Sequence, residues 1–276
     1  MSSSIGMSDA LLDVRGLGVD FRGVRVLGEV SLQIRAGETL GLVGESGSGK
    51  STLARAILRL IRPSRGQVLW RGRDLLRCDA ATLRAQRRDL QIVFQDPVAS
   101  LNPRMTVGGA LAEPLCIFEP HLVAVGRLTR MTRMLERVGL ADSMLSRYPH
   151  ELSGGQCQRV AIARAMMLHP KLLICDEAVS SLDVLIQGQI VNLLGDLQRE
   201  FGTALLFISH NLAVVRHISH RVAVIHNGDL IETASCDALF SAPTHPYTRA
   251  LLDAVLIPVP VPAPDPISDL PGPGPV

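Results

Sequence analysis

The sequence contains almost no lysine, few aromatic residues and no long apolar segment. Of its 28 Lys and Arg residues only Lys50 and Lys171 are lysines, and aromatic residues make up 3% of the chain. No apolar run reaches the roughly 18–20 residues that a membrane-spanning helix requires. If the protein works at a membrane, we therefore expect it to dock onto another chain that is embedded there.

The cysteines are few and scattered, without the CxxC or CxxH spacing of a metal site. This pattern argues against a disulfide framework or a zinc site and favours a reducing, cytosolic compartment. Residues 1–16 lack the basic segment and apolar core of a signal peptide. The five cysteines are Cys78, Cys116, Cys157, Cys175 and Cys236.

The net charge of +2 is too small to indicate a general polyanion-binding surface. We therefore expect no nucleic-acid partner. The arginine-rich segment 84–88 could touch nucleic acid or lipid, but it reads more simply as a solvated helix face. The tail from Ile257 onward holds 8 of the 17 prolines, so it should be extended or disordered. It is either a passive tail or a polyproline docking segment.

Strand and helix patterns alternate along most of the chain, which indicates an α/β fold with a mainly parallel sheet covered on both faces. Residues 105–169 contain helical patterns and no convincing strand. Antiparallel strands are predicted for residues 10–40 and hairpins for 66–76 and 221–232. Buried strands are predicted at 40–44, 90–96, 171–177 and 203–210, and helices at 51–61 and 184–200.

The segment GESGSGKS matches the pattern G-x-x-x-x-G-K-[ST] between a predicted strand and a predicted helix. Glycines let backbone N–H groups curl around phosphate oxygens, and the helix adds its positive N-terminal end. The compact ammonium of Lys50 can reach β- and γ-phosphates where a planar guanidinium could not turn. Ser51 would place its hydroxyl on Mg²⁺. A chance glycine loop is the alternative. The predicted nucleotide-binding residues are Gly44, Glu45, Ser46, Gly47, Ser48, Gly49, Lys50, Ser51 and Thr52.

Two adjacent carboxylates, Asp176 and Glu177, follow the apolar strand LLIC. Asp176 would hold Mg²⁺ through its water shell, and Glu177 would polarise the attacking water as general base. The structural alternative for such a pair is a helix N-cap. Cys175 most simply packs in the strand, because no activating base is evident.

The segment LSGGQ provides a second anion-binding surface. Ser153, Gly154, Gly155 and Gln156 precede a helical pattern, so a hydroxyl and bare glycine amides lie at a helix N-terminus. One chain needs only one such surface for its own phosphate loop. We therefore expect the nucleotide to be sandwiched between two chains.

With these motifs in this order, the chain resembles the ATP-binding subunits of ABC transporters. The resemblance implies ATP and Mg²⁺ as ligands and a P-loop NTPase (RecA-like) fold. That fold has a mainly parallel sheet core, an N-terminal antiparallel β subdomain and an inserted α-helical subdomain. The implied ATPase domain spans 10–256, with a core of 10–97 and 170–240, a helical subdomain of 98–169, an extension of 241–256 and a tail of 257–276.

The resemblance also implies roles for residues outside the phosphate loop. Gln95 would touch Mg²⁺ or the water and sense the membrane partner, and His210 would contact the γ-phosphate. Phe21 would stack on adenine, although strand-end Phe residues commonly just pack. Ser181 and Asp183 lie in the D-loop. The catalytic set is thus Glu177, His210 and Gln95, and the Mg²⁺ set is Ser51, Gln95 and Asp176.

Segments 94–107, 147–156 and 245–255 resemble the oligopeptide, dipeptide and nickel importer branch, and the chain resembles its F-type ATPase subunit. The chain departs from the usual pattern of the family at DEAVSSLD, Asn211 and Cys157, and these departures indicate a particular subfamily. The implied partners are a second ATPase subunit, as a hetero- or homodimer, two membrane permeases and an extracytoplasmic substrate-binding protein. The chain would be peripheral on the cytoplasmic side of the inner (plasma) membrane.

Several alternatives stay open at this point. The substrate is a peptide or, alternatively, nickel or a metal chelate. A soluble ABC protein of DNA repair or translation would need long coiled coils or tandem cassettes, and a non-hydrolysing regulatory cassette would not need to retain Lys50 and Glu177. No cysteine follows Cys236, so no iron–sulfur cluster is expected.

Overall fold

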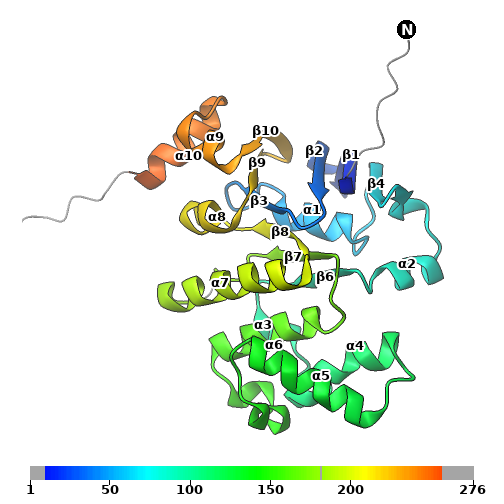
Figure 1. Ribbon diagram of the computed structural model, residues 1–276. Coiled ribbons are helices and arrows are strands. Elements are labelled where there is room, and N and C mark those ends of the chain that lie inside the picture. Colours follow the sequence, from blue (N-terminus) through cyan, green and yellow to red (C-terminus); the bar gives the residue numbers. More distant parts are fainter. Residues whose placement is uncertain (1–9, 181, 257–276) are drawn as a thin grey trace, which may run out of the picture.

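The computed structural model of the protein describes residues 10–180 and 182–256. Its centre is a six-stranded sheet of order β10-β9-β3-β8-β7-β6, with helices on both faces (Figure 1). Strands β9, β3, β8, β7 and β6 run parallel, and β10 pairs antiparallel with β9 at one edge. The strands are β3 (Thr39–Val43), β6 (Leu90–Val93), β7 (Leu172–Asp176), β8 (Ala204–Ile208), β9 (Arg221–His226) and β10 (Asp229–Ser235).

A second, antiparallel sheet is built mainly from the first part of the chain. It has the order β2-β1-β4-β5. The two long strands β1 and β2 pair with each other, and β4 pairs with both β1 and β5. The predicted antiparallel strands and both predicted hairpins are therefore confirmed. The strands are β1 (Ala10–Phe21), β2 (Val24–Arg35), β4 (Arg65–Trp70) and β5 (Arg73–Asp74).

The segment between β6 and β7 contains helices and no strand, as the sequence predicts. Helices α3 to α6 gather at one end of the molecule, and β1, β2, α9 and α10 lie at the other (Figure 1). No helix in the described ranges is both long and apolar enough to cross a membrane. The helices are α1 (Lys50–Ile57), α2 (Ala80–Gln86), α3 (Pro97–Ser100), α4 (Val107–Phe118), α5 (Ala124–Arg137), α6 (Gly154–Met166), α7 (Val184–Phe201), α8 (Leu212–Ile218), α9 (Cys236–Ser241) and α10 (Pro246–Leu256), with short 3₁₀ turns η1 (Leu75–Arg77), η2 (Asp142–Ser146) and η3 (Pro149–Glu151).

The two faces of the six-stranded sheet pack into two different cores. Successive side chains of a strand point to opposite faces. Along β7, Leu172 and Ile174 therefore pack with α1 and the antiparallel sheet, whereas Leu173 and Cys175 pack with helices α4 to α10. All five residues of β7 are buried. A strand covered on both sides reads as a continuous apolar run, which explains why it could be recognised from the sequence.

Helix α1 is shorter than predicted. The apolar pattern extends to Ile61, but the helix ends at Ile57. Arg59 adopts a left-handed φ of 52°, which stops the helix. Its guanidinium donates to the carbonyl oxygens of Leu75 at 3.2 Å and Cys78 at 2.5 Å. A contact with a distant segment thus overrides the local helical pattern.

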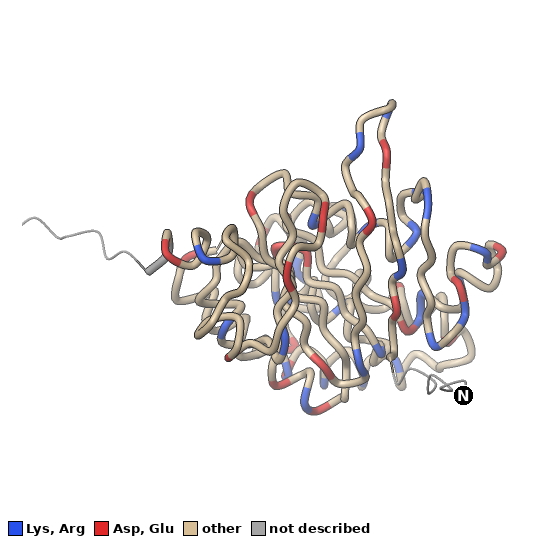
Figure 2. Tube along the Cα trace, turned by 90° about the horizontal axis from the view of Figure 1, so that it is seen from above, with Lys and Arg blue, Asp and Glu red and all other residues tan. Residues whose placement is uncertain are grey.

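Charged residues of both signs are interspersed along the described chain. Figure 2 shows Lys and Arg interspersed with Asp and Glu along the trace. This arrangement agrees with the small net charge of +2.

Candidate nucleotide site

The glycine loop lies between β3 and α1, as predicted. Gly44 follows the last residue of β3, and α1 begins at Lys50. A Cβ on Gly44 would lie 2.2 Å from the carbonyl oxygen of Ile225, so no other residue fits there. Gly49 has a φ of 103°, and a Cβ there would lie 2.6 Å from a methyl carbon of Leu27. These two glycines are required by the neighbouring strands as well as by the loop conformation.

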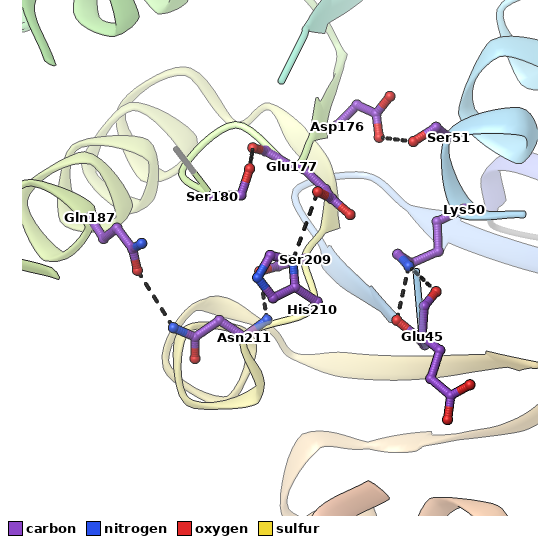
Figure 3. Close-up of polar contacts among 11 residues, drawn as sticks. Glu45, Lys50, Ser51, Asp176, Glu177, Ser180, Gln187, Ser209, His210 and Asn211 are labelled. Atoms are coloured by element: carbon purple, nitrogen blue, oxygen red, sulfur yellow. Dashed lines mark hydrogen bonds and ion pairs between the residues drawn. The ribbon is translucent and has the colours of Figure 1, made fainter. Parts of the chain in front are cut away.

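Lys50 is turned back into the loop that precedes it (Figure 3). The residue is 4% exposed, and its Nζ donates to the carbonyl oxygens of Gly44 at 2.9 Å and Glu45 at 2.7 Å. Burial lowers the pKa of Lys50, while the nearby carboxylates of Glu177 and Asp176 act in the opposite direction. The ammonium therefore lies inside the loop, next to two acidic side chains.

Ser51 and Asp176, the two predicted Mg²⁺ ligands at this position, are in direct contact (Figure 3). The Ser51 hydroxyl donates to Asp176 Oδ1 at 2.8 Å. Asp176 is 2% exposed at the carboxyl end of β7, and burial raises the pKa of its carboxyl group, although the bond from Ser51 works against this. The contact joins the start of α1 to β7 and gathers two hard oxygen ligands in one place.

Glu177 is the residue after Asp176, and its side chain faces His210, which lies two residues beyond the end of β8 (Figure 3). Glu177 Oε2 lies 3.8 Å from His210 Nδ1, with the glutamate side chain 16% and the histidine side chain 58% exposed. The two come together because β7 and β8 are adjacent parallel strands. Glu177 has a positive φ of 49°, a conformation that is uncommon for non-glycine residues and clusters at functional sites.

The turn after Glu177 is held by several hydrogen bonds. The backbone N–H of Glu177 donates to Ile208 at 3.0 Å, and its carbonyl oxygen accepts from the backbone N–H of Ser180 at 3.1 Å and from the Ser180 hydroxyl at 2.9 Å. The carboxylates are thus not an N-cap. The residue that caps α7 is Asp183, which accepts from the Ile186 N–H at 3.0 Å. Ser181, predicted in the D-loop, lies outside the described residues.

The segment LSGGQ begins helix α6, as predicted. Ser153 accepts from the Gln156 N–H at 3.3 Å, and the Gln156 side chain accepts from the Ser153 N–H at 2.9 Å. This capping box fixes the turn. Gly154 lies next to Leu182, just before α7, and Gly155 lies next to Ile186 in the first turn of α7. Helix α6 lies in the helical part of the molecule, well apart from α1 in the view of Figure 1.

Gln95 and Phe21 lie at the surface. Gln95 is exposed and lies two residues beyond Val93, so it is not the last residue of β6 as the sequence suggested. Phe21 is the last residue of β1 and is 49% exposed. The sequence-predicted roles of both residues therefore stay predictions.

Three further contacts at the site were missed by the sequence analysis. The Gly228 N–H donates to the Ser48 carbonyl oxygen at 3.1 Å, and the Glu45 N–H donates to the Tyr247 hydroxyl at 3.4 Å. Asn211 donates to Gln187 at 3.5 Å. A signal for the second contact is present in the sequence, because Tyr247 lies in segment 245–255, but that segment indicated only a transporter branch.

A parallel sheet whose strand–glycine loop–helix turn carries a buried lysine beside a serine–aspartate pair defines the class of P-loop nucleoside triphosphatases. The family model described as ABC transporter matches residues 27–180, more than half of the sequence. The chain belongs to the ABC transporter family, and the predicted fold class is confirmed.

Several characterised proteins are similar to this chain. It is 49% identical to the oligopeptide transport ATP-binding protein OppF of Haemophilus influenzae, over 91% of this chain and 79% of the relative. It is 55% identical to OppF of Escherichia coli, over 83% of this chain and 69% of the relative. The solved dimer of the ATP-binding cassette MJ0796 with ADP and Pi superposes with a TM-score of 0.75 at 28% identity, over 82% of this chain and 98% of that one.

Proposed function

We propose that this chain is the ATP-hydrolysing subunit of a peptide importer. The observation that carries the proposal is the separation of two anion-binding surfaces within one chain. The glycine loop ends in α1, whereas the exposed, capped turn at Ser153 begins α6 in the helical part. Each triphosphate would therefore lie between the glycine loop of one chain and the Ser153 turn of a second. The cassette MJ0796, which is similar to this chain, is a dimer with ADP and Pi bound, and its dimeric state supports a site made by two chains.

The residues at the glycine loop fit Mg²⁺–ATP. Ser51 and Asp176 supply two oxygen ligands 2.8 Å apart, and no group of three or more acidic, histidine or cysteine ligands occurs in residues 10–180 and 182–256. Mg²⁺ is usually bound by one or two protein oxygens together with substrate phosphates and water. When bound, the ion would neutralise charge on the phosphates.

The chain's own side chains would perform the other steps. Lys50 would exchange its two carbonyl partners for phosphate oxygens, which it can do because those partners are in its own loop. Glu177 would take the proton of the attacking water, and His210, 3.8 Å away, would contact the γ-phosphate. Opening and closing of the two chains would follow ATP binding and phosphate loss.

A groove beside Gln95 is the proposed contact with the permeases. It has a volume of about 280 Å³ and is lined by Phe94, Pro114 and Phe118 together with an ion pair between Arg164 and Glu113 at 3.0 Å. Apolar walls with a few polar groups suit a short helix of a partner protein. We place the chain on the cytoplasmic face of the inner membrane, with two permeases, a second ATPase subunit and an extracytoplasmic binding protein.

Peptides are favoured over nickel as substrate. Relatives at 49–55% identity are named for oligopeptides, and another at 53% identity, from Shigella boydii, is named for import of glutathione, itself a small peptide. The test is ATP hydrolysis by the chain assembled with its permeases and partner ATPase in vesicles, with peptide or nickel supplied through the binding protein. Stimulation by nickel alone would overturn the peptide assignment.

The variant Glu177→Gln tests the site directly. Loss of a general base lowers turnover by about 10²–10⁴-fold, whereas ATP affinity should stay unchanged and an ATP-bound pair of ATPase chains should accumulate on size-exclusion chromatography. Glu136→Gln, at an exposed residue of α5, is the matched control. Turnover like that of the unmodified chain would remove Glu177 as the base.

A further inference from the structure

The C-terminal helix α10 reaches the glycine loop through one side chain. Tyr247 is the second residue of α10, and its hydroxyl accepts from the backbone N–H of Glu45 at 3.4 Å. Its ring packs at a tilt against the ring of His226, with centroids 3.9 Å apart. Residues 45 and 247 are far apart in sequence, so this contact joins α10 to the first limb of the loop.

Tyr247 is held in place by a tight turn in front of it. The carboxylate of Glu232, on β10, accepts from the Thr244 N–H and the Thr244 hydroxyl, both at 2.8 Å, and from the His245 N–H at 3.0 Å. The Tyr247 N–H then donates to His245 Nδ1 at 3.1 Å. Burial alone would raise the pKa of Glu232, but hydrogen bonding from Thr248, the largest opposing cause, together with that from Thr244 and His245, lowers the pKa to about 2.

The other limb of the loop is held from the same region of the molecule. Gly228, in the turn between β9 and β10, donates its N–H to the Ser48 carbonyl oxygen at 3.1 Å and accepts from the Gly28 N–H at 2.8 Å. A Cβ on Gly228 would lie 2.3 Å from the Val26 carbonyl oxygen, so the turn is fixed against β2. His226 lies only two residues before this glycine, which links the two supports of the loop.

We propose that Tyr247 is a positioning residue for ATP, which holds the first limb of the glycine loop in the form that receives phosphates. The proposal rests on the proposed ATPase function. If the loop adopts this form only part of the time, its apparent affinity for the ligand falls in proportion to the fraction of molecules in that form. Coupling of two binding events is reciprocal. ATP in the loop therefore stabilises the docked position of α10, and docked α10 favours ATP.

The variant Tyr247→Phe tests this proposal because it removes the hydroxyl and keeps the ring against His226. Loss of one neutral hydrogen bond should raise the Kd and KM for ATP about 2- to 10-fold, with kcat nearly unchanged. The matched control is Asp253→Asn, at an exposed position of the same helix, which should leave both constants unchanged. The assays are nucleotide titration and steady-state hydrolysis with the full chain.

Hydrogen–deuterium exchange supplies a readout that simple packing would not move. ATP should slow exchange of the α10 amides in the unmodified chain and have a smaller effect in Tyr247→Phe. Unchanged ATP affinity in Tyr247→Phe, or a change confined to the melting temperature, would overturn the positioning role. An unmodified chain that binds no ATP would instead overturn the proposed function and this inference with it.

Discussion

Asp176→Asn should stabilise the nucleotide-free protein while it removes the response to Mg²⁺–ATP. Asp176 is 2% exposed, and among the described residues its carboxylate accepts one hydrogen bond, from the Ser51 hydroxyl at 2.8 Å. Burial raises the pKa of the carboxyl group because the charged form is poorly solvated there. The ionised carboxylate thus lowers the stability of the folded state at the position of the proposed Mg²⁺ site.

The magnitude follows from what asparagine changes. Its amide oxygen can still accept from Ser51, and its shape is nearly the same, so the change mainly removes a buried charge. A raised folded-state pKa means that the folded state favours the uncharged form, and a tenfold difference in proton affinity between the folded and unfolded states corresponds to about 1.4 kcal/mol. Arg55 and Lys50 partly compensate the charge here, so we expect about 1 kcal/mol, a rise in Tm of about 2–4 °C for a domain of this size.

The pH dependence has a definite sign. The folded-state pKa of Asp176 is raised above the unfolded value of 3.8. The folded state therefore binds the proton more tightly, and the stability loss appears as the pH rises through the folded pKa. Below pH 3.8 the carboxyl group is protonated in both states. The difference in Tm between Asp176→Asn and the unmodified chain should be largest at neutral pH and shrink as the pH falls toward that value.

The measurement is thermal unfolding in EDTA without nucleotide, followed by the same scan with Mg²⁺ and ATP. The unmodified chain should gain stability from the ligands, and Asp176→Asn should gain much less. Ser51→Ala is the comparison, because it leaves the carboxylate without its donor and should lower Tm. A Tm of Asp176→Asn below that of the unmodified chain at neutral pH would refute the reasoning.

Two further predictions concern Lys50 and Glu232. Lys50→Ala should weaken ATP binding about 10- to 100-fold, because hydrogen bonds to charged groups are worth roughly 1.5–3 kcal/mol. The control Lys171→Ala, at an exposed lysine, should leave ATP binding unchanged. If a nucleotide titration gave the two variants equal affinities, Lys50 would be excluded from the phosphate site. Glu232 has a pKa lowered to about 2, so its stabilising contribution is complete above about pH 4.5 and lost as the pH falls toward 2. Thermal scans of Glu232→Gln should accordingly show a lower Tm than the unmodified chain at pH 6 and a similar Tm near pH 2, and a constant difference would contradict this.

The parts of the fold that could be predicted are those in which burial produces a recognisable pattern of apolar residues along consecutive positions of the sequence. Strands β7 and β8 are covered on both faces, so each appears as an uninterrupted apolar run; β7 ends in Asp176, and His210 lies two residues beyond the last residue of β8. The end of α1 could not be predicted in this way. Arg59 interrupts a good helical pattern because its guanidinium finds carbonyl acceptors in a segment 16 to 19 residues further on.

The same distinction applies to the site. Lys50, Ser51 and Asp176 could be recognised because phosphate and Mg²⁺ demand particular groups at fixed positions after a strand, and the sheet then brings those ends together. Tyr247 could not be recognised, because its contact with Glu45 depends on how the start of α10 packs against His226 at the end of β9. An aromatic residue near the start of an amphipathic helix is most simply interpreted as packing. Only the position of its hydroxyl, next to the loop that would hold the triphosphate, leads to the proposal that α10 influences nucleotide binding.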